Sequence, residues 1–542
     1  MPRPAETSLP WLAPGLVFGL ALAVYGLTAP PGLTWANASA DGGDLITAAL
    51  TLGVPHPGGY PTWTLLAALF GQLPVGAMAW RATLLSMVSA AAAGAWTAAT
   101  VPILAQQVSA RPAAHGFATE STAGETSTRR SSPAVLLLST TPALAAGLAL
   151  AFSPMLWGQA TVAEVYALQA GLAAGALWAL VRRQAGGGDG WAAAAGLFLG
   201  LGLGNHLTTV WLLPAAGILL WTAGANAAGR TRAFAACCAG LAAGLLVFLY
   251  LPWAAAGDSP VNWAAPGGLD RLWWLVSGEL YQGYAFAAPW AAVPGRLAAW
   301  SAELWRSFLP WGLAAALLGL ATLFQRQRAL VVALGSSLLL GLAWAIGYDT
   351  SDSLFTLLPG WIILALALGV GVATLLDWLA ARWRSVALVA ALFSLALAVA
   401  PVAGHWQQQN LRRDRAAEQF YSQVLQHVAD DALVLTVGDR ATFALWYGRY
   451  GLELRPDVTP VSRDLWPLPS YRALIASRHP DLAGPVPPAD WPALLDHAGQ
   501  QRPLYLAQAG LAGVDQPPVI HGWQPALALQ GDGWRLWRLE QP

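Results

Sequence analysis

Residues 41–61 read DGGDLITAALTLGVPHPGGYP and follow the first apolar segment of the chain. Asp41 and Asp44 are three positions apart, so they share one face of a helix. Asp41 is also a natural N-cap for the short amphipathic helix predicted over residues 44–53. A cap would explain Asp41, but it explains neither Asp44 nor His56 in the Pro/Gly turn that follows. Carboxylates beside a bilayer are costly and are usually retained for a function, so this segment indicates a functional site.

The composition is that of a polytopic membrane protein. The chain has 542 residues, of which 56% are hydrophobic and 10% are charged, whereas a soluble domain carries about a quarter charged residues. The formal net charge is zero, which gives no indication of a nucleic-acid partner. The two cysteines, Cys237 and Cys238, are adjacent in an apolar run and are interpreted as packing residues.

Hydropathy and the positions of basic turns predict about eleven membrane crossings, with the N-terminus in the cytoplasm and the C-terminus outside. The predicted spans are 11–29, 78–106, 134–152, 164–181, 191–204, 207–223, 233–253, 307–324, 329–347, 354–378 and 385–403. They form a transmembrane domain over residues 1–404. Its predicted outer loops are 30–77, 153–163 and 254–305, and a flexible cytoplasmic loop is predicted at 107–133. In the first outer loop, residues 44–53 and 60–73 are each predicted to form a short helix on the membrane surface.

The run 191–223 is predicted to be a helical hairpin rather than a single crossing. Arg182-Arg183 precede it and Arg230 follows it, so both flanks should be cytoplasmic. The turn is placed at Gly204-Asn205-His206, which brings His206 to the outer side of the membrane.

Residues 405–542 lose the membrane character and predict a soluble extracytoplasmic α/β domain. A strand over 432–437, a helix to about residue 450 and a strand near 457–462 give a βαβ-like pattern. Further strands are expected at 504–507 and 534–539. Asp439 follows the first strand and is interpreted as part of a turn.

Five groups of residues, in order along the chain, carry a resemblance to one membrane protein family. They are the 41–61 segment with its Asp-x-Gly-acid and His-Pro-x-Gly-Tyr-Pro motifs, the segment Ser153 to Tyr166, Gly202 to His206, Asn262-Trp263, and Gly438 to Val458. This pattern resembles the transmembrane-protein-260-type O-mannosyltransferases, which are similar to the GT-C glycosyltransferases that use lipid-phosphate-linked sugars. One departure is Asp44, where the family usually has glutamate.

The resemblance implies a catalytic carboxylate in the first outer loop. Asp41 is the expected general base, and Asp44 is the alternative or a partner to Asp41. The donor phosphate is expected to meet His56, Arg81 and His206. Other interpretations stay open: His56 fixes the Pro/Gly turn, and Arg81 is a snorkelling residue at a helix end.

Six further residues are expected to contact the acceptor or to support the catalytic groups: Tyr60, Trp157, Gln159, Glu164, Tyr166 and Asn205. Glu164 alternatively stabilises the N-terminus of a span through the helix dipole, and Asn205 alternatively caps the second arm of the hairpin. Tryptophans within 263–305 are either interface anchors or sugar-stacking residues.

The function implied is inverting transfer of a hexose, mannose favoured, from a polyprenyl-phosphate donor to a hydroxyl acceptor. The acceptor is expected to be Ser or Thr of an exported protein, and a glycolipid or cell-wall polymer stays open. The enzyme is expected in the plasma (inner) membrane among membrane lipids, with no bound cofactor and no metal. A lipid-linked sugar transporter or flippase is the first rival. It is disfavoured because the sequence shows neither charged residues in mid-span nor evident repeats. A non-catalytic receptor is the second rival.

Overall fold

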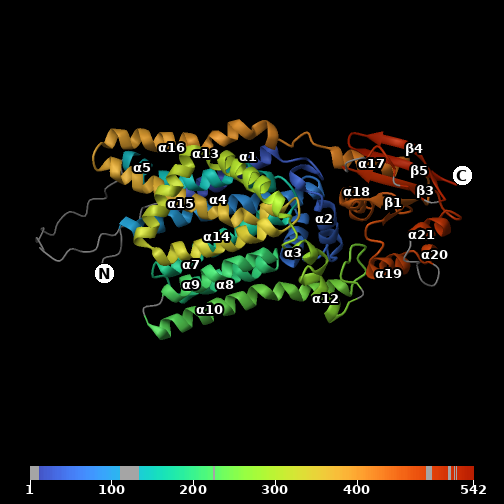
Figure 1. Ribbon diagram of the computed structural model, residues 1–542, viewed down its shortest axis with the longest axis horizontal. Helices are drawn as coiled ribbons and strands as arrows, with labels where there is room; N and C mark the ends of the chain where they lie inside the picture. Colours follow the sequence, from blue (N-terminus) through green and yellow to red (C-terminus); the bar gives the residue numbers. More distant parts are fainter. Residues whose placement is uncertain are drawn as a thin grey trace, which may run out of the picture.

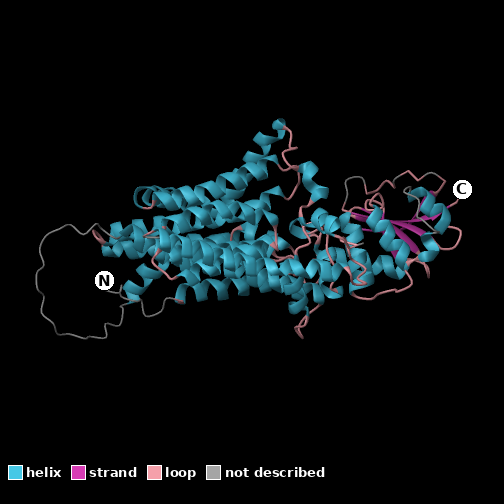
Figure 2. Ribbon diagram, turned by 90° about the horizontal axis from the view of Figure 1, so that it is seen from below, coloured by secondary structure: helices cyan, strands magenta, loops and turns pink. Residues whose placement is uncertain are grey.

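The computed structural model describes residues 11–109, 133–223, 226–265, 267–483, 491–510, 514–517, 519–520 and 522–541. A bundle of long helices forms one end of the molecule, and the part that contains all the strands forms the other (Figures 1 and 2). The expectation of a mainly helical membrane protein with a small C-terminal α/β part is confirmed. Most of the predicted cytoplasmic loop at 107–133 lies outside the described residues.

Each of the eleven predicted spans coincides with a helix. These helices are α1 (Leu12–Thr28), α4 (Met78–Ser109), α5 (Pro133–Ala151), α7 (Val165–Gln184), α8 (Asp189–Leu203), α9 (Leu213–Thr222), α10 (Ala227–Leu245), α13 (Val293–Arg326), α14 (Arg328–Gly347), α15 (Leu358–Ala380) and α16 (Arg384–Gln409). Eight helical segments among the described residues are long and apolar enough to cross a membrane, and α1, α8 and α9 are shorter apolar helices. The structure therefore contains an integral membrane bundle.

Short helices gather at the end of the bundle that faces the C-terminal part (Figure 1). Those labelled in Figure 1 are α2 (Gly42–Thr51), α3 (Pro61–Gly71) and α12 (Leu269–Val276). The chain also contains the short helices α6 (Pro154–Ala160) and α11 (Tyr250–Ala255). The helices α2 and α3 match the two predicted in the first outer loop. The arrangement places the whole 41–61 segment at this end.

Two predicted outer loops contain more helix than expected. The segment 153–163 holds α6, whose residues are all buried. The Ser153 hydroxyl caps this helix by accepting a hydrogen bond from the backbone N–H of Leu156 (3.3 Å). The next residue is a proline, which is common at the first position of a helix. The loop predicted over 254–305 ends early because α13 begins at Val293. This helix has a kink at Leu309 (φ +54°), just before Pro310.

The predicted hairpin over 191–223 is present. Helix α8 ends at Leu203, and α9 begins at Leu213 after a short 3₁₀ turn. The turn contacts the start of α3, because the backbone N–H of Thr62 donates to the carbonyl of Gly204 (3.0 Å) and its hydroxyl donates to the carbonyl of Leu201 (2.8 Å). These bonds fix the tip of the hairpin beside the 41–61 segment.

Helices α8 and α10 approach at backbone distance through glycines spaced four apart. A Cβ at Gly196 would lie 1.9 Å from the carbonyl oxygen of Cys237, and a Cβ at Gly240 would lie 1.9 Å from that of Ala193. Gly200 and Gly244 repeat the contact one turn later. Small residues at this spacing let membrane helices pack closely.

The C-terminal part contains a five-stranded sheet of order β2-β1-β3-β5-β4. Its strands are β1 (Leu433–Val437), β2 (Thr459–Ser462), β3 (Leu504–Ala509), β4 (Gln524–Gly531) and β5 (Trp534–Glu540). Its helices are α17 (Ala416–His427), α18 (Asp439–Trp446), α19 (Pro469–Arg478), α20 (Pro480–Ala483) and α21 (Trp491–Ala498). The parallel β1–β2 pair flanking α18 matches the predicted βαβ pattern, whereas β4 is an additional strand.

The glycine contact between α8 and α10 yields a stability prediction. Gly240→Val forces a side chain into the backbone of α8 and should lower the free energy of unfolding by about 1–3 kcal/mol. The matched control is Gly335→Val on α14, because nothing lies within 4 Å of a Cβ there. Thermal unfolding in detergent should show a lower midpoint for Gly240→Val alone, and equal midpoints would contradict the packing described.

Candidate active site

The backbone of the 41–61 segment is held by the loop that follows α11 and by α12. Val54 exchanges hydrogen bonds with this loop: its N–H donates to the carbonyl of Val261 (2.9 Å), and its carbonyl accepts from the N–H of Trp263 (3.1 Å). The N–H of Gly58 donates to the carbonyl of Leu275 (2.8 Å). Gly58 has φ +109°, a conformation that side chains rarely adopt, so glycine permits the turn after His56.

A fully buried carboxylate organises the centre of the site. Asp44 Oδ2 accepts from the backbone N–H of His56 (2.9 Å) and pairs with its ring Nδ1 (2.8 Å). Asp44 Oδ1 accepts from the indole Nε1 of Trp263 (3.0 Å). Because all three bonds use this carboxylate and none of its surface is exposed, Asp44 positions its neighbours and is closed to an incoming hydroxyl.

Asp41 lies on the other side of the His56 ring. Its Oδ2 is 3.7 Å from His56 Nε2, and 37% of its side-chain surface is exposed. Asp41 precedes α2, but its side chain forms no capping hydrogen bond, so the N-cap interpretation is wrong for the carboxylate. Of the two first-loop acids, Asp41 is therefore the one that a substrate can reach.

The electrostatics of this pair suit proton transfer. Burial raises the pKa of Asp41 to about 6, against the lowering effect of His56 and with a further rise from Asp439 and Asp44. Burial alone would lower the pKa of His56, but Asp41 and the bonded Asp44 outweigh it and raise the pKa to about 9. Near pH 7 the pair is thus an ionised carboxylate, more basic than usual, beside an imidazolium.

Aromatic rings connect His56 to the tip of the hairpin. The ring of Tyr60 lies 4.9 Å from that of His56 and 6.3 Å from that of His206. Tyr166 lies 5.3 Å from His206, and its hydroxyl donates to Asp352 from the turn between α14 and α15. The expected convergence of His206 on the first-loop residues is therefore found.

The C-terminal part also contributes to the site. Phe443 on α18 lies nearly parallel to the ring of His56, with centroids 6.5 Å apart and planes at 16°. A Cβ at Gly43 would lie 2.2 Å from the carbonyl oxygen of Phe443, so only glycine allows α18 to pack this closely on α2. The side chain of Asp439, in the first turn of α18, is exposed and forms no hydrogen bond or ion pair with a described residue. The surrounding protein partly removes its carboxylate from water and raises its pKa, whereas the nearby His56 lowers the pKa.

Glu164 and Asn205 lie at the edge of this cluster. Glu164 is buried, makes no capping bond to α7, and has an Oε1 with no hydrogen-bond partner among the described residues. Burial and the charge of Asp41 raise its pKa well above the ordinary value. The side-chain N–H of Asn205 donates to the carbonyl of Val165 (2.9 Å), which ties the hairpin tip to the start of α7.

Three expected site residues are used elsewhere. The guanidinium of Arg81 donates to the backbone carbonyls of Gly71, Val75 and Gly76, so it closes the loop before α4 and is not joined to the cluster. The indole of Trp157 is fully buried and donates to the Thr28 hydroxyl (2.9 Å).

Gln159 is the third of these residues, and its side-chain N–H donates to the carbonyl of Asn37 (3.1 Å). No group of three or more metal-ligating residues in the described chain could hold a metal ion, and metal-free transfer stays a prediction.

Sequence reasoning did not select Asp352 and Asp439 for the site. Asp352 lies in an acidic turn, and its hydrogen-bond partner, Tyr166, is far away in the sequence. Asp439 follows a strand, where a turn is the ordinary interpretation. A motif shared with the family was the only signal at Asp439.

Comparison with known proteins shows a similar fold and the same family resemblance. Residues 41–229 match the family model of the protein O-mannosyl-transferase TMEM260 N-terminal domain. The protein O-mannosyl-transferase TMEM260 of Mus musculus is 27% identical over 525 residues, which cover 88% of this chain and 67% of the relative.

Two crystal structures of ArnT from Cupriavidus metallidurans share the architecture. The one bound to undecaprenyl phosphate has a TM-score of 0.54 at 12% identity and covers 98% of both chains. The apo structure has a TM-score of 0.58 at 11% identity and covers 97% of both chains. Residues 41–229 are thus similar to the TMEM260-type family of protein O-mannosyl-transferases, and the chain has the fold of the two ArnT structures.

Proposed function

We propose that this enzyme transfers a hexose, with mannose favoured, from a polyprenyl-phosphate donor to a Ser or Thr hydroxyl of an exported protein, with inversion. The observation that carries the proposal is the Asp41–His56 pair. It combines a reachable carboxylate and a buried imidazolium 3.7 Å apart, at the start of α2, which lies at one end of the membrane bundle (Figure 1). A receptor would have no need for a basic carboxylate held against a cation, whereas acceptor activation requires one.

Asp41 is the general base in this proposal. It removes the proton from the acceptor hydroxyl as that oxygen bonds to the anomeric carbon and the bond to the donor phosphate breaks. Its raised pKa, about 6, makes it a stronger base than an ordinary carboxylate while leaving it ionised at neutral pH. Asp44 holds His56 in place and does not touch the acceptor.

His56 and the hairpin tip are proposed to receive the donor phosphate. The Nδ1 of His56 is bonded to Asp44, so its Nε2–H is the donor left for Asp41 or for a phosphate oxygen. His206 lies one aromatic ring further along, beside Tyr60. The relatives support this choice of donor class, because one ArnT structure contains undecaprenyl phosphate.

The first test separates the two first-loop acids. Asp41→Asn removes the charge while nearly preserving shape, so kcat for transfer from polyprenyl-phosphate-mannose should fall about 10²–10⁴-fold with little change in donor affinity. Asp44→Asn removes the partner of His56, so donor binding should weaken together with the rate. Normal turnover in Asp41→Asn and none in Asp44→Asn would reverse the assignment. Thermal midpoints of both variants check that folding is intact.

The second test is the pH dependence of kcat/KM. Activity should rise as Asp41 loses its proton near pH 6 and should fall near pH 9 as His56 loses its own. The charged groups that act on Asp41 are His56, Asp439, Asp44 and Asp352.

Removal of the negative charge in Asp439→Asn should lower the pKa of Asp41, because Asp439 is one of the groups that raise it. The acid limb should therefore move to lower pH. The control is Asp532→Asn in the β4–β5 turn of the same domain, which should leave the profile unchanged. If the acid limb does not move in Asp439→Asn, then Asp439 does not influence the pKa of Asp41.

The third test concerns the side of the membrane. We propose that the site and the C-terminal domain lie outside the plasma membrane, since the basic turns between spans should be cytoplasmic. In a variant without Cys237 and Cys238, an impermeant thiol reagent applied to intact cells should label Gln500→Cys and leave Ala381→Cys unlabelled. Both positions are exposed. The opposite pattern would reverse the orientation.

A further inference from the structure

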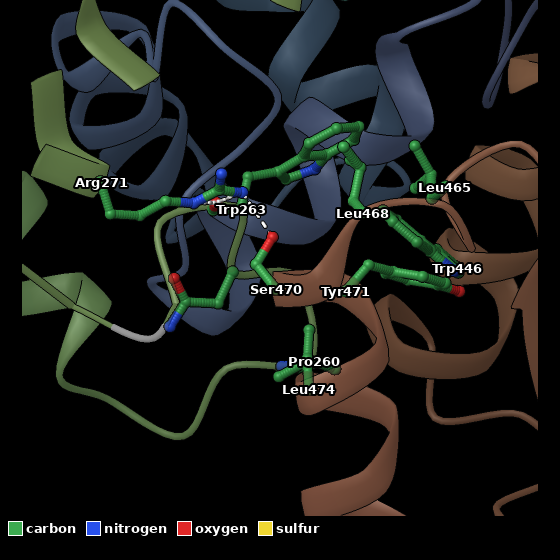
Figure 3. Close-up of a pocket in the computed structure, with 10 residues that line it drawn as sticks. Pro260, Trp263, Arg271, Trp446, Leu465, Leu468, Ser470, Tyr471 and Leu474 are labelled. Atoms are coloured by element: carbon green, nitrogen blue, oxygen red, sulfur yellow. Dashed lines mark hydrogen bonds between the residues drawn. The ribbon is translucent and has the colours of Figure 1, made fainter. Parts of the chain in front are cut away.

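A pocket lies at the seam between the outer loop after α11 and the C-terminal domain (Figure 3). It contains about 290 Å³ of empty space, part of it open to solvent. The outer loop provides Asn262, Trp263 and Arg271, and α18 with the segment through α19 provides most of the opposite wall. Nothing in the proposed mechanism uses this space.

Most of the pocket wall is apolar. The rings of Trp446 and Tyr471 lie 6.3 Å apart at 31°, and Trp263 lies 6.4 Å from Trp446. Leucine side chains, including Leu468 and Leu474, complete the wall (Figure 3). Such a surface favours burial of an apolar side chain.

A positive charge without an ionic partner lies at the edge of the pocket. Arg271 donates from Nε and Nη2 to the carbonyl of Trp263 (3.1 and 2.9 Å) and from Nη2 to the hydroxyl of Ser470 (2.6 Å). Its guanidinium lies 3.5 Å over the ring of Trp274. Its Nη1 forms no hydrogen bond with a described residue, and no described carboxylate lies within ion-pair distance of it; Glu279 acts on it only as a more distant negative charge.

A buried acceptor without a partner lies beside this cation. Asn262 is 5% exposed; its side-chain N–H donates to the carbonyl of Ala255 (3.0 Å), whereas its Oδ1 has no hydrogen-bond partner among the described residues. A buried amide oxygen without a partner is unfavourable, so a ligand that offers an N–H to Asn262 Oδ1 would gain a hydrogen bond there.

We propose that this pocket binds an extended segment of the acceptor polypeptide. Arg271 Nη1 donates to a peptide carbonyl, Asn262 Oδ1 accepts from a peptide N–H, and an apolar side chain of the acceptor fills the space between Trp446, Tyr471 and Leu474. The inference rests on the proposed transfer to a Ser or Thr hydroxyl of a protein, and it adds the place on the enzyme at which the acceptor polypeptide is held.

The balance of polar groups favours a peptide over a carbohydrate. A peptide unit presents one acceptor and one donor, which match Arg271 and Asn262 and leave the apolar wall to a side chain. A hexose would place several hydroxyls against the leucines, where they would lose their hydrogen bonds with water. A lipid chain would leave both polar groups without partners.

Trp263 connects this pocket to the catalytic cluster. One part of its indole lines the pocket, while its Nε1 donates to Asp44, which holds His56. A polypeptide in the pocket is therefore separated from the catalytic cluster by a single side chain. This proximity suits a segment that flanks the reacting Ser or Thr.

The test fills the pocket without touching the catalytic residues. Leu474→Trp occupies the apolar space, and Ala473→Trp on the same helix is the matched control, since Ala473 is exposed and does not line the pocket. Each enzyme is assayed with polyprenyl-phosphate-mannose and three acceptors. These are a synthetic peptide with one threonine flanked by leucines, the same peptide with glycines in place of the leucines, and glycerol, which is too small to span pocket and base.

The wild-type enzyme should have a lower KM for the leucine-flanked peptide than for the glycine-flanked one. Leu474→Trp should raise the KM for the leucine-flanked peptide about tenfold or more, with transfer to glycerol unchanged, and Ala473→Trp should behave as wild type. An unchanged KM in Leu474→Trp, or equal KM values for both peptides in the wild type, would overturn the proposal that the pocket binds the acceptor. Transfer to glycerol in the same assay would still uphold the proposed catalytic site. Competition by methyl mannoside against the peptide would instead make the pocket a sugar subsite. No transfer to any acceptor by the wild type would overturn the proposed function and this inference together.

Discussion

The buried carboxylate of Asp44 is the contact on which the rest of the site depends. It joins three parts of the chain through its bonds to the backbone and ring of His56 and to the indole of Trp263. A buried carboxylate is unfavourable unless it is paired and hydrogen-bonded, and these bonds satisfy both needs. The same bonds determine which nitrogen of His56 faces Asp41. Asp44 therefore determines the orientation of the imidazolium without meeting a substrate.

Local patterns were sufficient to predict the membrane bundle. The eleven spans follow from runs of apolar residues, and the hairpin at 204–206 follows from the basic residues on both of its flanks. Helix α6 was not predicted because a seven-residue helix with a first-turn proline resembles a loop when its burial is unknown. Strand β4 was not predicted because its central residues, 525–529, are all apolar, so the alternation of apolar and polar residues typical of a strand is absent.

The site was predictable where a motif was compact and not where contacts were distant. Asp41, Asp44 and His56 lie within one short segment, so sequence alone brought them together, but it could not decide which acid was reachable. That choice depends on Trp263, more than two hundred positions away, because its hydrogen bond to Asp44 helps to shield that carboxylate from a substrate. Arg81 shows the reverse case. Its position at a helix end is compatible with a phosphate contact or with a snorkelling side chain. Only its hydrogen bonds to the carbonyls of Gly71 and Gly76 show that it closes the loop before α4.

The close contact of Gly43 with Phe443 has a consequence for biosynthesis. A ribosome delivers the 41–61 segment early and α18 late, so the site stays incomplete until most of the chain has been inserted. During that interval the first-loop acids have no cover from the C-terminal domain. The candidate site is thus assembled in two stages, and the docking of α18 onto α2 completes it.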